Sequence, residues 1–234
     1  MLRVEVLTFD GCPHARAALE PVRDVAAQLA PGEPLEQVRI KTDEEARRAG
    51  FLGSPSVRID GRDLEDLVGD GGALGSRRYS NGDGLPSRPL VEAGLLRALR
   101  PRHLLFLCVA NSARSQLAKG LARALAPEGV RVSSAGSAPK SVRPEAVEVL
   151  REEGIDISSH RSKAVSEIDS ASVDAVIPLR AEVASPLFPG KARRLHWALP
   201  DPAKEQGSPE RRLEAFRRVR DRLRVRLERL FAEA

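Results

Sequence analysis

The segment HLLFLCVANSARSQ at residues 103–116 constrains this chain more than any other part of it. An apolar run ends at Cys108, and Arg114 follows after five intervening residues. We predict a buried strand over residues 103–108, a tight loop, and a helix that begins near Ser112. Five residues let the loop curl until its backbone N–H groups point at one anion, and the helix N-terminus adds partial positive charge. The sequence therefore predicts an anion-binding loop that carries a thiol.

The residue types in this loop suit nucleophilic chemistry. The positive field favours the thiolate form of Cys108, and the planar guanidinium of Arg114 matches two oxygens of a bound anion. A hydroxyl at Ser115 can donate to the sulfur, while Asn111 tolerates left-handed backbone geometry. The alternative is a buried cysteine that acts only as a small apolar residue. The residues expected to bind the oxyanion are Val109, Ala110, Asn111, Ser112, Ala113 and Ser115.

Four motifs in the same order resemble the low-molecular-weight phosphatase family over residues 102–234. They are CVANSARS at 108–115, SAG at 134–136, GIDISSH at 154–160 and the pair Asp201-Pro202. Within that family, NSARSQ and SHRSK resemble the arsenate reductase branch. Ala113 and Ala203 stand where the tyrosine phosphatases usually carry bulky or aromatic groups. The resemblance therefore implies a site for a small tetrahedral oxyanion.

The resemblance also implies roles for individual residues. Cys108 would attack the arsenic atom, Arg114 and the loop amides would stabilise the transition state, and Asp201 would protonate the departing oxygen. By context alone, Asp201 could equally begin a turn. A hydrogen-bonded network that fixes the loop would comprise Asn111, Ser115, Ser134 and His160.

The cysteine content separates this chain from many arsenate reductases of this type, which carry two further cysteines after the third strand. Here the whole chain has two cysteines, Cys12 and Cys108, and the later relay position reads Ser185. Reduction of arsenate takes two electrons, so a second thiol is required. It is either Cys12 or an external donor, for which glutathione, mycothiol, bacillithiol and a redoxin all remain open.

Residues 1–100 resemble thioredoxin-like proteins. A strand is followed by Cys12 and then a helix, and the second cysteine of a Cys-x-x-Cys motif would fall at Ala15, which makes this a one-thiol version. Pro55 stands before the strand 56–59, where such folds place a cis proline. Cys12 is thus predicted to be redox-active and to resolve the Cys108 adduct. The alternatives are an inert thiol, or a metal-chelating remnant with His14.

We therefore expect two α/β domains. Residues 1–100 would form a thioredoxin-like α/β sandwich, and residues 101–234 a low-molecular-weight phosphatase-like fold whose parallel sheet is flanked by helices. Expected strands are 2–9, 35–40, 56–59, 62–66, 103–108, 130–134, 173–178 and 193–197. Expected helices are 14–29, 43–50, 89–99, 112–126, 143–153, 181–188 and 208–232. The Gly/Ser/Asp-rich stretch 69–89 would be either a flap that brings Arg77, Arg78 and Tyr79 to a thiol ligand, or disordered.

Composition and charge exclude several classes of protein. The first 100 residues carry a net charge of −2 and the remainder +7, which suits an anionic substrate. Aromatic residues make up only 3% of the chain, against single-stranded nucleic-acid binding. There is no apolar run that could span a membrane and no secretory signal, and the few cysteines favour a reducing cytoplasm. No zinc-like spacing or Gly-rich dinucleotide motif occurs, so we expect no bound metal or cofactor.

The sequence is compatible with three functions. The main one is reduction of arsenate to arsenite through a covalent Cys108–arsenic adduct. The alternative is hydrolysis of phosphate monoesters through a phosphocysteine, as in the low-molecular-weight protein-tyrosine phosphatases. The third is a non-enzymatic role, in which residues 1–100 bind arsenic or mercury, or sense redox state.

Overall fold

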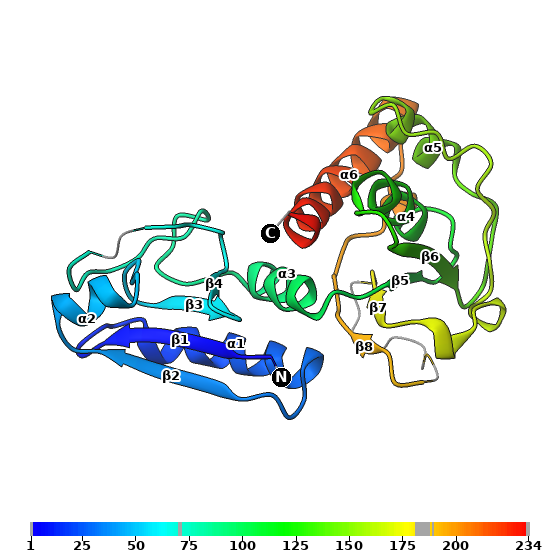
Figure 1. Ribbon diagram of the computed structural model, residues 1–234. Coiled ribbons are helices and arrows are strands. Elements are labelled where there is room, and N and C mark those ends of the chain that lie inside the picture. The colour runs from blue at the N-terminus through cyan, green and yellow to red at the C-terminus, as the bar shows by residue number, and fades with distance from the viewer. Residues whose placement is uncertain (1, 70–71, 181–187, 189, 233–234) are drawn as a thin grey trace. The chain divides into compact units, whose positions relative to one another are not determined.

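A computed structural model describes residues 2–69, 72–180, 188 and 190–232 of the chain. The chain divides into two compact units, Met1–Arg100 and Pro101–Ala234 (Figure 1). Each unit contains its own four-stranded sheet. Chains of about 100 residues and more bury enough surface to sustain a core of their own.

The first unit holds a mixed sheet with strand order β2-β1-β3-β4. β1 pairs in parallel with β2 and antiparallel with β3. A two-residue turn at Asp60 and Gly61 joins β3 to β4, and both residues have the positive φ that such a turn requires (52° and 79°). The elements are β1 (Val4–Phe9), α1 (Ala15–Leu29), β2 (Leu35–Ile40), α2 (Asp43–Arg48), β3 (Ser56–Ile59), β4 (Arg62–Asp63) and α3 (Arg88–Leu99).

Two expected elements of this unit are shorter than the sequence suggested. The helix expected over 43–50 ends at Arg48, because Gly50 adopts a left-handed conformation (φ 56°) that a helix cannot continue through. The strand expected over 62–66 ends at Asp63, and Asp66 is likewise left-handed (φ 58°). In both places a local backbone reversal, rather than hydrophobic pattern, sets the boundary.

The segment after β4 is tied to the start of β3. The N–H of Ser54 donates to the carbonyl of Gly75 at 2.7 Å, and the N–H of Arg77 donates to the carbonyl of Ser54 at 3.0 Å. These two bonds form an isolated parallel bridge between Ser54 and Ser76. This part of the 69–89 stretch is therefore an ordered extension of the sheet edge.

Two side chains of this segment, those of Arg77 and Tyr79, point inward. Arg77 is 4% exposed; its guanidinium pairs with the buried carboxylate of Asp63 and with Glu65. Tyr79 is 3% exposed and donates its hydroxyl to the carbonyl of Pro55 at 3.0 Å. The prediction that Arg77 and Tyr79 contact a thiol ligand is therefore wrong, because buried partners hold both side chains inside the unit.

The second unit holds a parallel sheet with strand order β6-β5-β7-β8. β5 lies in its interior and is buried along its whole length, as an apolar central strand should be. The strands are β5 (His103–Cys108), β6 (Arg131–Gly136), β7 (Ala175–Pro178) and β8 (Arg193–Arg194). The helices are α4 (Arg114–Leu125), α5 (Pro144–Arg151) and α6 (Pro209–Phe231), with short 3₁₀ turns η1 (Val165–Glu167), η2 (Ser170–Ser172) and η3 (Pro202–Lys204).

Side chains alternate across this sheet and build two cores. α4 packs on β5, β6 and α6 (Figure 1), and on β5 the ring of Phe106 lies 6.1 Å from that of Trp197. Leu105 and Leu107 belong to a second cluster, which includes Phe188 and against which the segment carrying η1 packs. Both cores hold the carboxyl end of β5, and hence Cys108, in a fixed position. The helix expected over 181–188 lies outside the described residues, except for Phe188.

Two boundaries near the site differ from expectation. The helix expected from Ser112 begins at Arg114, because Ala113 has a non-helical backbone (φ −126°, ψ −92°) and still belongs to the loop. β8 ends at Arg194, although the N–H groups of Leu195 and Trp197 continue to donate to the carbonyls of β7.

None of the described helices combines the length and the apolar character of a bilayer span.

The buried Arg77 cluster predicts a localised loss of stability. Arg77→Ala would leave the carboxylate of Asp63 buried and unpaired, which costs ~3–5 kcal/mol in the first unit. Urea unfolding followed by far-UV circular dichroism should show this loss. The fluorescence transition of Trp197, the single tryptophan, reports the second unit and should not move.

Arg78→Ala is the matched control, because Arg78 is the exposed neighbour in the same segment. It should change the free energy of unfolding by no more than ~0.5 kcal/mol. Equal effects of the two substitutions would show that the Arg77 ion pair does not stabilise the unit.

Candidate active site

The loop between β5 and α4 turns its carbonyl groups away from its own centre. The carbonyls of Val109, Ala110 and Ser112 each accept a hydrogen bond of 2.9 Å from an N–H in the segment 138–143. With the carbonyls fixed outside, the N–H groups are left to face an anion. In the described part of the chain, no acceptor is bonded to the N–H groups of Ala110, Ser112, Ala113 and Arg114.

Gly136 at the end of β6 lets the loop lie this close to the sheet. A Cβ at this position would lie 2.7 Å from the N of Asn111 and would also clash with the carbonyl of Val109. Both are backbone atoms, so neither can move without distorting the loop. The glycine of the SAG motif is therefore a steric requirement of this loop, residues 109–113, which we call the anion loop.

Ser134 of the same motif does not join the expected network. It is 1% exposed, and its Oγ makes no hydrogen bond to any described residue. Ser134 pairs across the sheet with Phe106, two residues before the point where β6 meets the loop. The structure therefore corrects the prediction, because the hydroxyl lies beside the middle of β5 rather than at its end.

A directed chain of hydrogen bonds ends on the sulfur of Cys108. The backbone N–H of Lys163 donates to Oδ1 of Asn111 at 2.9 Å, so the amide nitrogen of Asn111 is the donor to Ser115 Oγ at 2.8 Å. The hydroxyl proton of Ser115 is then free to point at Cys108 Sγ, 2.9 Å away. The N–H of Asn111 also donates to this sulfur, at 3.2 Å. Two donors therefore point at the sulfur.

Asn111 adopts the left-handed conformation (φ 47°) that the sequence indicated for the loop. Its carbonyl accepts hydrogen bonds from Gln116 Nε2 at 2.9 Å and from Ser162 Oγ at 2.6 Å. Gln116 is fully buried, and the sequence analysis assigned it no role. The sequence does offer a signal for Gln116, because an amide side chain stands there on the buried face of α4.

His160 reaches the loop through Gln116. Its Nδ1 lies 3.1 Å from Gln116 Oε1. Burial, followed by the nearby positive charges of Lys119, Arg123 and Lys163, lowers the pKa of His160 to about 4. The ring is therefore neutral at pH 7, and Nδ1 carries the proton that Gln116 accepts. His160 thus supports the loop from behind, without touching the sulfur.

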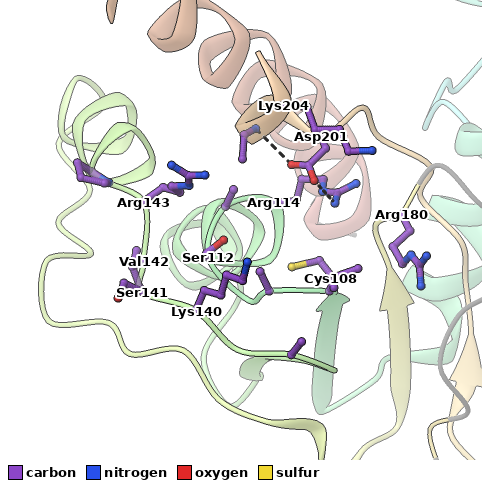
Figure 2. Close-up of a pocket in the computed structure, with 16 residues that line it drawn as sticks. Cys108, Ser112, Arg114, Lys140, Ser141, Val142, Arg143, Arg180, Asp201 and Lys204 are labelled. Carbon is purple, nitrogen blue, oxygen red and sulfur yellow. Dashed lines mark hydrogen bonds and ion pairs between the residues drawn. The ribbon is translucent and has the colours of Figure 1, made fainter. Parts of the chain in front are cut away.

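Arg114 and Asp201 meet across 87 residues of sequence. Nη2 of Arg114 donates to Oδ2 of Asp201 at 2.9 Å (Figure 2). Nη1 of Arg114 donates to the carbonyl of Leu199 at 3.2 Å. Oδ1 of Asp201 accepts from the N–H of Ala203 at 3.2 Å and so caps η3. Two residues that the sequence analysis chose separately thus form one ion pair beside Cys108.

A pocket of about 850 Å³ opens above the loop (Figure 2). Cys108 and Arg114 line it, although they are only 4% and 6% exposed, so the sulfur lies deep rather than at the surface. Asp201 is the one carboxylate among its lining residues. The lining also includes the cationic side chains Lys140, Arg143, Arg180 and Lys204.

Cys12 lies in the other unit, in the turn between β1 and α1. It is partly exposed, and its carbonyl accepts from the N–H of Ala15 at 3.3 Å, so it directly precedes the first turn of the helix. The peptide bond between Ser54 and Pro55 is cis. Within the described residues, no three His, Cys, Asp or Glu side chains gather as metal ligands would.

The family model described as low molecular weight phosphotyrosine protein phosphatase matches residues 103–234, more than half of the chain. The chain belongs to this phosphatase family. The resemblance that the four motifs indicated is therefore confirmed for the second unit. The segment that matches contains the anion loop, Gly136, His160 and Asp201.

Several similar proteins in this family carry the name arsenate reductase. The arsenate reductase of Bacillus licheniformis is 40% identical over 130 residues, which cover 55% of this chain and 93% of the relative. That of Bacillus subtilis is 38% identical with the same coverage. A solved structure described as an arsenate reductase in the phosphate binding state is 32% identical, with a TM-score of 0.50 over 56% of this chain and 97% of that one.

The hydrogen bond from Ser115 to Cys108 Sγ predicts that its removal slows alkylation of the thiol. Ser115→Ala removes one of the two donors to Cys108 Sγ, and hydrogen bonds to charged groups contribute about 1.5–3 kcal/mol. Alkylation of Cys108 by iodoacetamide at pH 7 should therefore slow by roughly tenfold. Peptide mass spectrometry would follow Cys108 and Cys12 in the same sample, so that Cys12 serves as an internal reference. A rate unchanged relative to Cys12 would show that the Ser115 proton does not stabilise the thiolate.

The lowered pKa of His160 predicts that the second unit loses stability in acid. Its pKa is about 4 when folded and ~6.5 when unfolded. Between these pH values only the unfolded chain binds the proton, so stability falls as the pH drops below ~6.5 and is unaffected above it. Between pH 7 and pH 5 the free energy of unfolding of the second unit should fall by about 1 kcal/mol less in His160→Asn than in the wild type. This figure is discounted for the partial exposure of the ring.

The measurement is urea unfolding at both pH values, followed by the fluorescence of Trp197. His14→Asn, in the first unit, is the control and should leave the acid loss of this transition unchanged. If His160→Asn and the wild type lose the same stability, the ring is not held neutral by its surroundings.

Proposed function

We propose that this protein reduces arsenate to arsenite at Cys108. The observation that carries the proposal is the anion loop, in which outward carbonyls, N–H groups with no acceptor among the described residues, and a doubly hydrogen-bonded sulfur surround one point. The names of the relatives that share this segment support the same reaction. In the first step the thiolate of Cys108 attacks arsenic, an S–As bond forms, and one oxygen leaves as water with a proton from Asp201.

The ion pair between Arg114 and Asp201 links binding to this proton transfer. A bound oxyanion offers two oxygens to the guanidinium and so competes with the carboxylate for it. Asp201, released from Arg114, then lies beside the anion and serves as the acid that delivers a proton to the departing oxygen. Arg114 and the loop N–H groups stabilise the charge that develops on the remaining oxygens.

The second step needs another thiol. A thiolate attacks Cys108 Sγ, an S–S bond forms, and the S–As bond breaks with its electron pair passing to arsenic. Arsenic(V) becomes arsenic(III) and leaves as arsenite. A further thiol then reduces the disulfide on Cys108. In total, one arsenate and two thiols yield one arsenite, one disulfide and one water.

We further propose that the first unit is a thioredoxin-like domain and that Cys12 supplies one of these thiols. Three observations support it: the strand order β2-β1-β3-β4, the position of Cys12 between β1 and α1, and the cis Pro55 before β3. An external thiol or a redoxin is the alternative donor.

Phosphate-monoester hydrolysis is the second candidate, because the family is named for phosphotyrosine protein phosphatases. Phosphorus would replace arsenic in the first step, and water would then hydrolyse the phosphocysteine. Ala113 and Ala203 line the pocket with small side chains. Neither supplies an apolar wall that would hold the ring of a phosphotyrosine, so the lining does not favour that substrate.

The deciding experiment measures arsenite formed from arsenate with a panel of donors: small thiols, a glutaredoxin and a thioredoxin. The wild type should turn over with at least one donor, and Cys108→Ser should lose ~10³-fold or more of the rate. Release of phosphate from aryl phosphates without arsenite formation would assign the protein to the phosphatases. Tight binding of arsenite with no turnover would assign it to a binding role.

Cys12→Ser in the same assay tests the internal donor. If Cys12 resolves the adduct, this variant should lose turnover, and mass spectrometry of the wild type after one turnover should contain a Cys12–Cys108 disulfide. Normal turnover with small thiols and no such disulfide would exclude Cys12 from the reaction.

A further inference from the structure

The pocket above Cys108 is far larger than a single oxyanion. Its volume of about 850 Å³ falls in the range of ~300–1,000 Å³ typical of sites for organic molecules. The anion loop occupies only its floor, where Cys108 and Arg114 lie. Small side chains at Ala110, Ala138 and Ala203 leave the upper part open. The pocket can therefore hold a second molecule beside the bound anion.

The rim of this pocket is cationic. Lys140 and Arg143 come from the segment before α5, and Lys204 comes from η3; all three are exposed (Figure 2). Within the described part of the chain, none of the three side chains forms an ion pair. Asp201, the one carboxylate among the lining residues, is engaged by Arg114. The rim thus offers positive charge that the described residues do not neutralise.

The rim is held at a fixed place relative to the sulfur. The N–H groups of Lys140 and Arg143 donate to the carbonyls of Ala110 and Ser112, which belong to the anion loop itself. Lys204 follows Asp201 within the capped turn η3. The same bonds that shape the loop for an oxyanion therefore position cations around the approach to Cys108.

The second unit has no cysteine besides Cys108, so the thiol that attacks Sγ must enter this pocket from outside the unit. We propose that the pocket binds a low-molecular-weight thiol that bears carboxylates, with Lys140, Arg143 and Lys204 holding the carboxylates. This proposal rests on the proposed function and names the class of its co-substrate.

The proposed step is an exchange at Cys108 Sγ, in which the co-substrate thiolate displaces arsenite. The thiolate of the bound co-substrate attacks Cys108 Sγ of the arsenic adduct and forms a mixed disulfide, while the S–As electron pair leaves with arsenite. Cys12, or a second molecule of the same thiol, attacks the co-substrate sulfur of the mixed disulfide, frees the Cys108 thiolate and forms a disulfide with the first thiol. The carboxylates take no part in the chemistry; they hold the co-substrate against the rim.

The first test compares thiols of different charge in the full-length wild-type chain with saturating arsenate. The probes are glutathione, which bears carboxylates, 2-mercaptoethanol, which is neutral, and cysteamine, which is cationic. For Lys140→Glu/Arg143→Glu, kcat/KM for glutathione should fall tenfold or more, since each exposed pair contributes ~2- to 5-fold and reversal adds repulsion. For 2-mercaptoethanol the change should stay within about threefold, and for cysteamine the value should rise.

Arg222→Glu is the matched control, because Arg222 is an exposed cation on α6 that does not line the pocket. It should alter the values for all three thiols by no more than about twofold. Taking each variant relative to its parent cancels the intrinsic reactivity of each thiol.

A second test does not depend on arsenate. Glutathione disulfide and 2-hydroxyethyl disulfide each react with the Cys108 thiolate to form a mixed disulfide and release one thiolate, and mass spectrometry follows the rate. The charge-reversed variant should slow the reaction with glutathione disulfide at least tenfold relative to the neutral disulfide.

The outcomes of the two tests separate the two proposals. If neither test distinguishes the charged from the neutral probes, the subsite is refuted, even where arsenite is formed. If arsenite forms only with a protein redoxin, the subsite is refuted as well. If the disulfide test succeeds but no donor yields arsenite, the subsite stands and the proposed reductase activity fails.

Discussion

The site depends on one constraint, which is that the carbonyl groups of the anion loop are all bonded on its outer side. Those of Val109, Ala110 and Ser112 accept from the segment 138–143, and that of Asn111 accepts from Gln116 and Ser162. A peptide group whose carbonyl is held outward presents its N–H inward. The affinity of the loop for an oxyanion thus comes from backbone geometry, and Gly136 makes this geometry sterically available.

A second consequence of these bonds is that binding and reactivity share one scaffold. The chain from Lys163 through Asn111 and Ser115 delivers a proton donor to Cys108 Sγ. His160, kept neutral by burial and by neighbouring cations, holds this scaffold through Gln116. The segment that orders the loop also carries Lys140 and Arg143 of the cationic rim. Preorganised dipoles of this kind stabilise charge without rearranging during the reaction.

The first unit shows how composition can mislead. A stretch rich in Gly, Ser and Asp looked like a flap, yet Arg77 within it pairs with Asp63 in the interior. A buried charge is tolerated only with a partner, and that partner comes from β4 rather than from the stretch itself. Tyr79, which also belongs to this stretch, is buried, and its hydroxyl donates to the carbonyl of Pro55. No pattern local to residues 69–89 contains this information.

The sequence by itself determined what depends on near neighbours: the strand that ends at Cys108, the loop that closes at Arg114, the left-handed Asn111 and most helix limits. These follow from spacing, periodicity and backbone preference, which act over a few residues. Only the tertiary structure decided that Arg114 meets Asp201, that Gln116 joins His160 to the loop, that Ser134 stands apart and that Lys140 and Arg143 border the pocket. Such contacts join segments far apart in the chain, so they depend on strand order and packing rather than on local pattern.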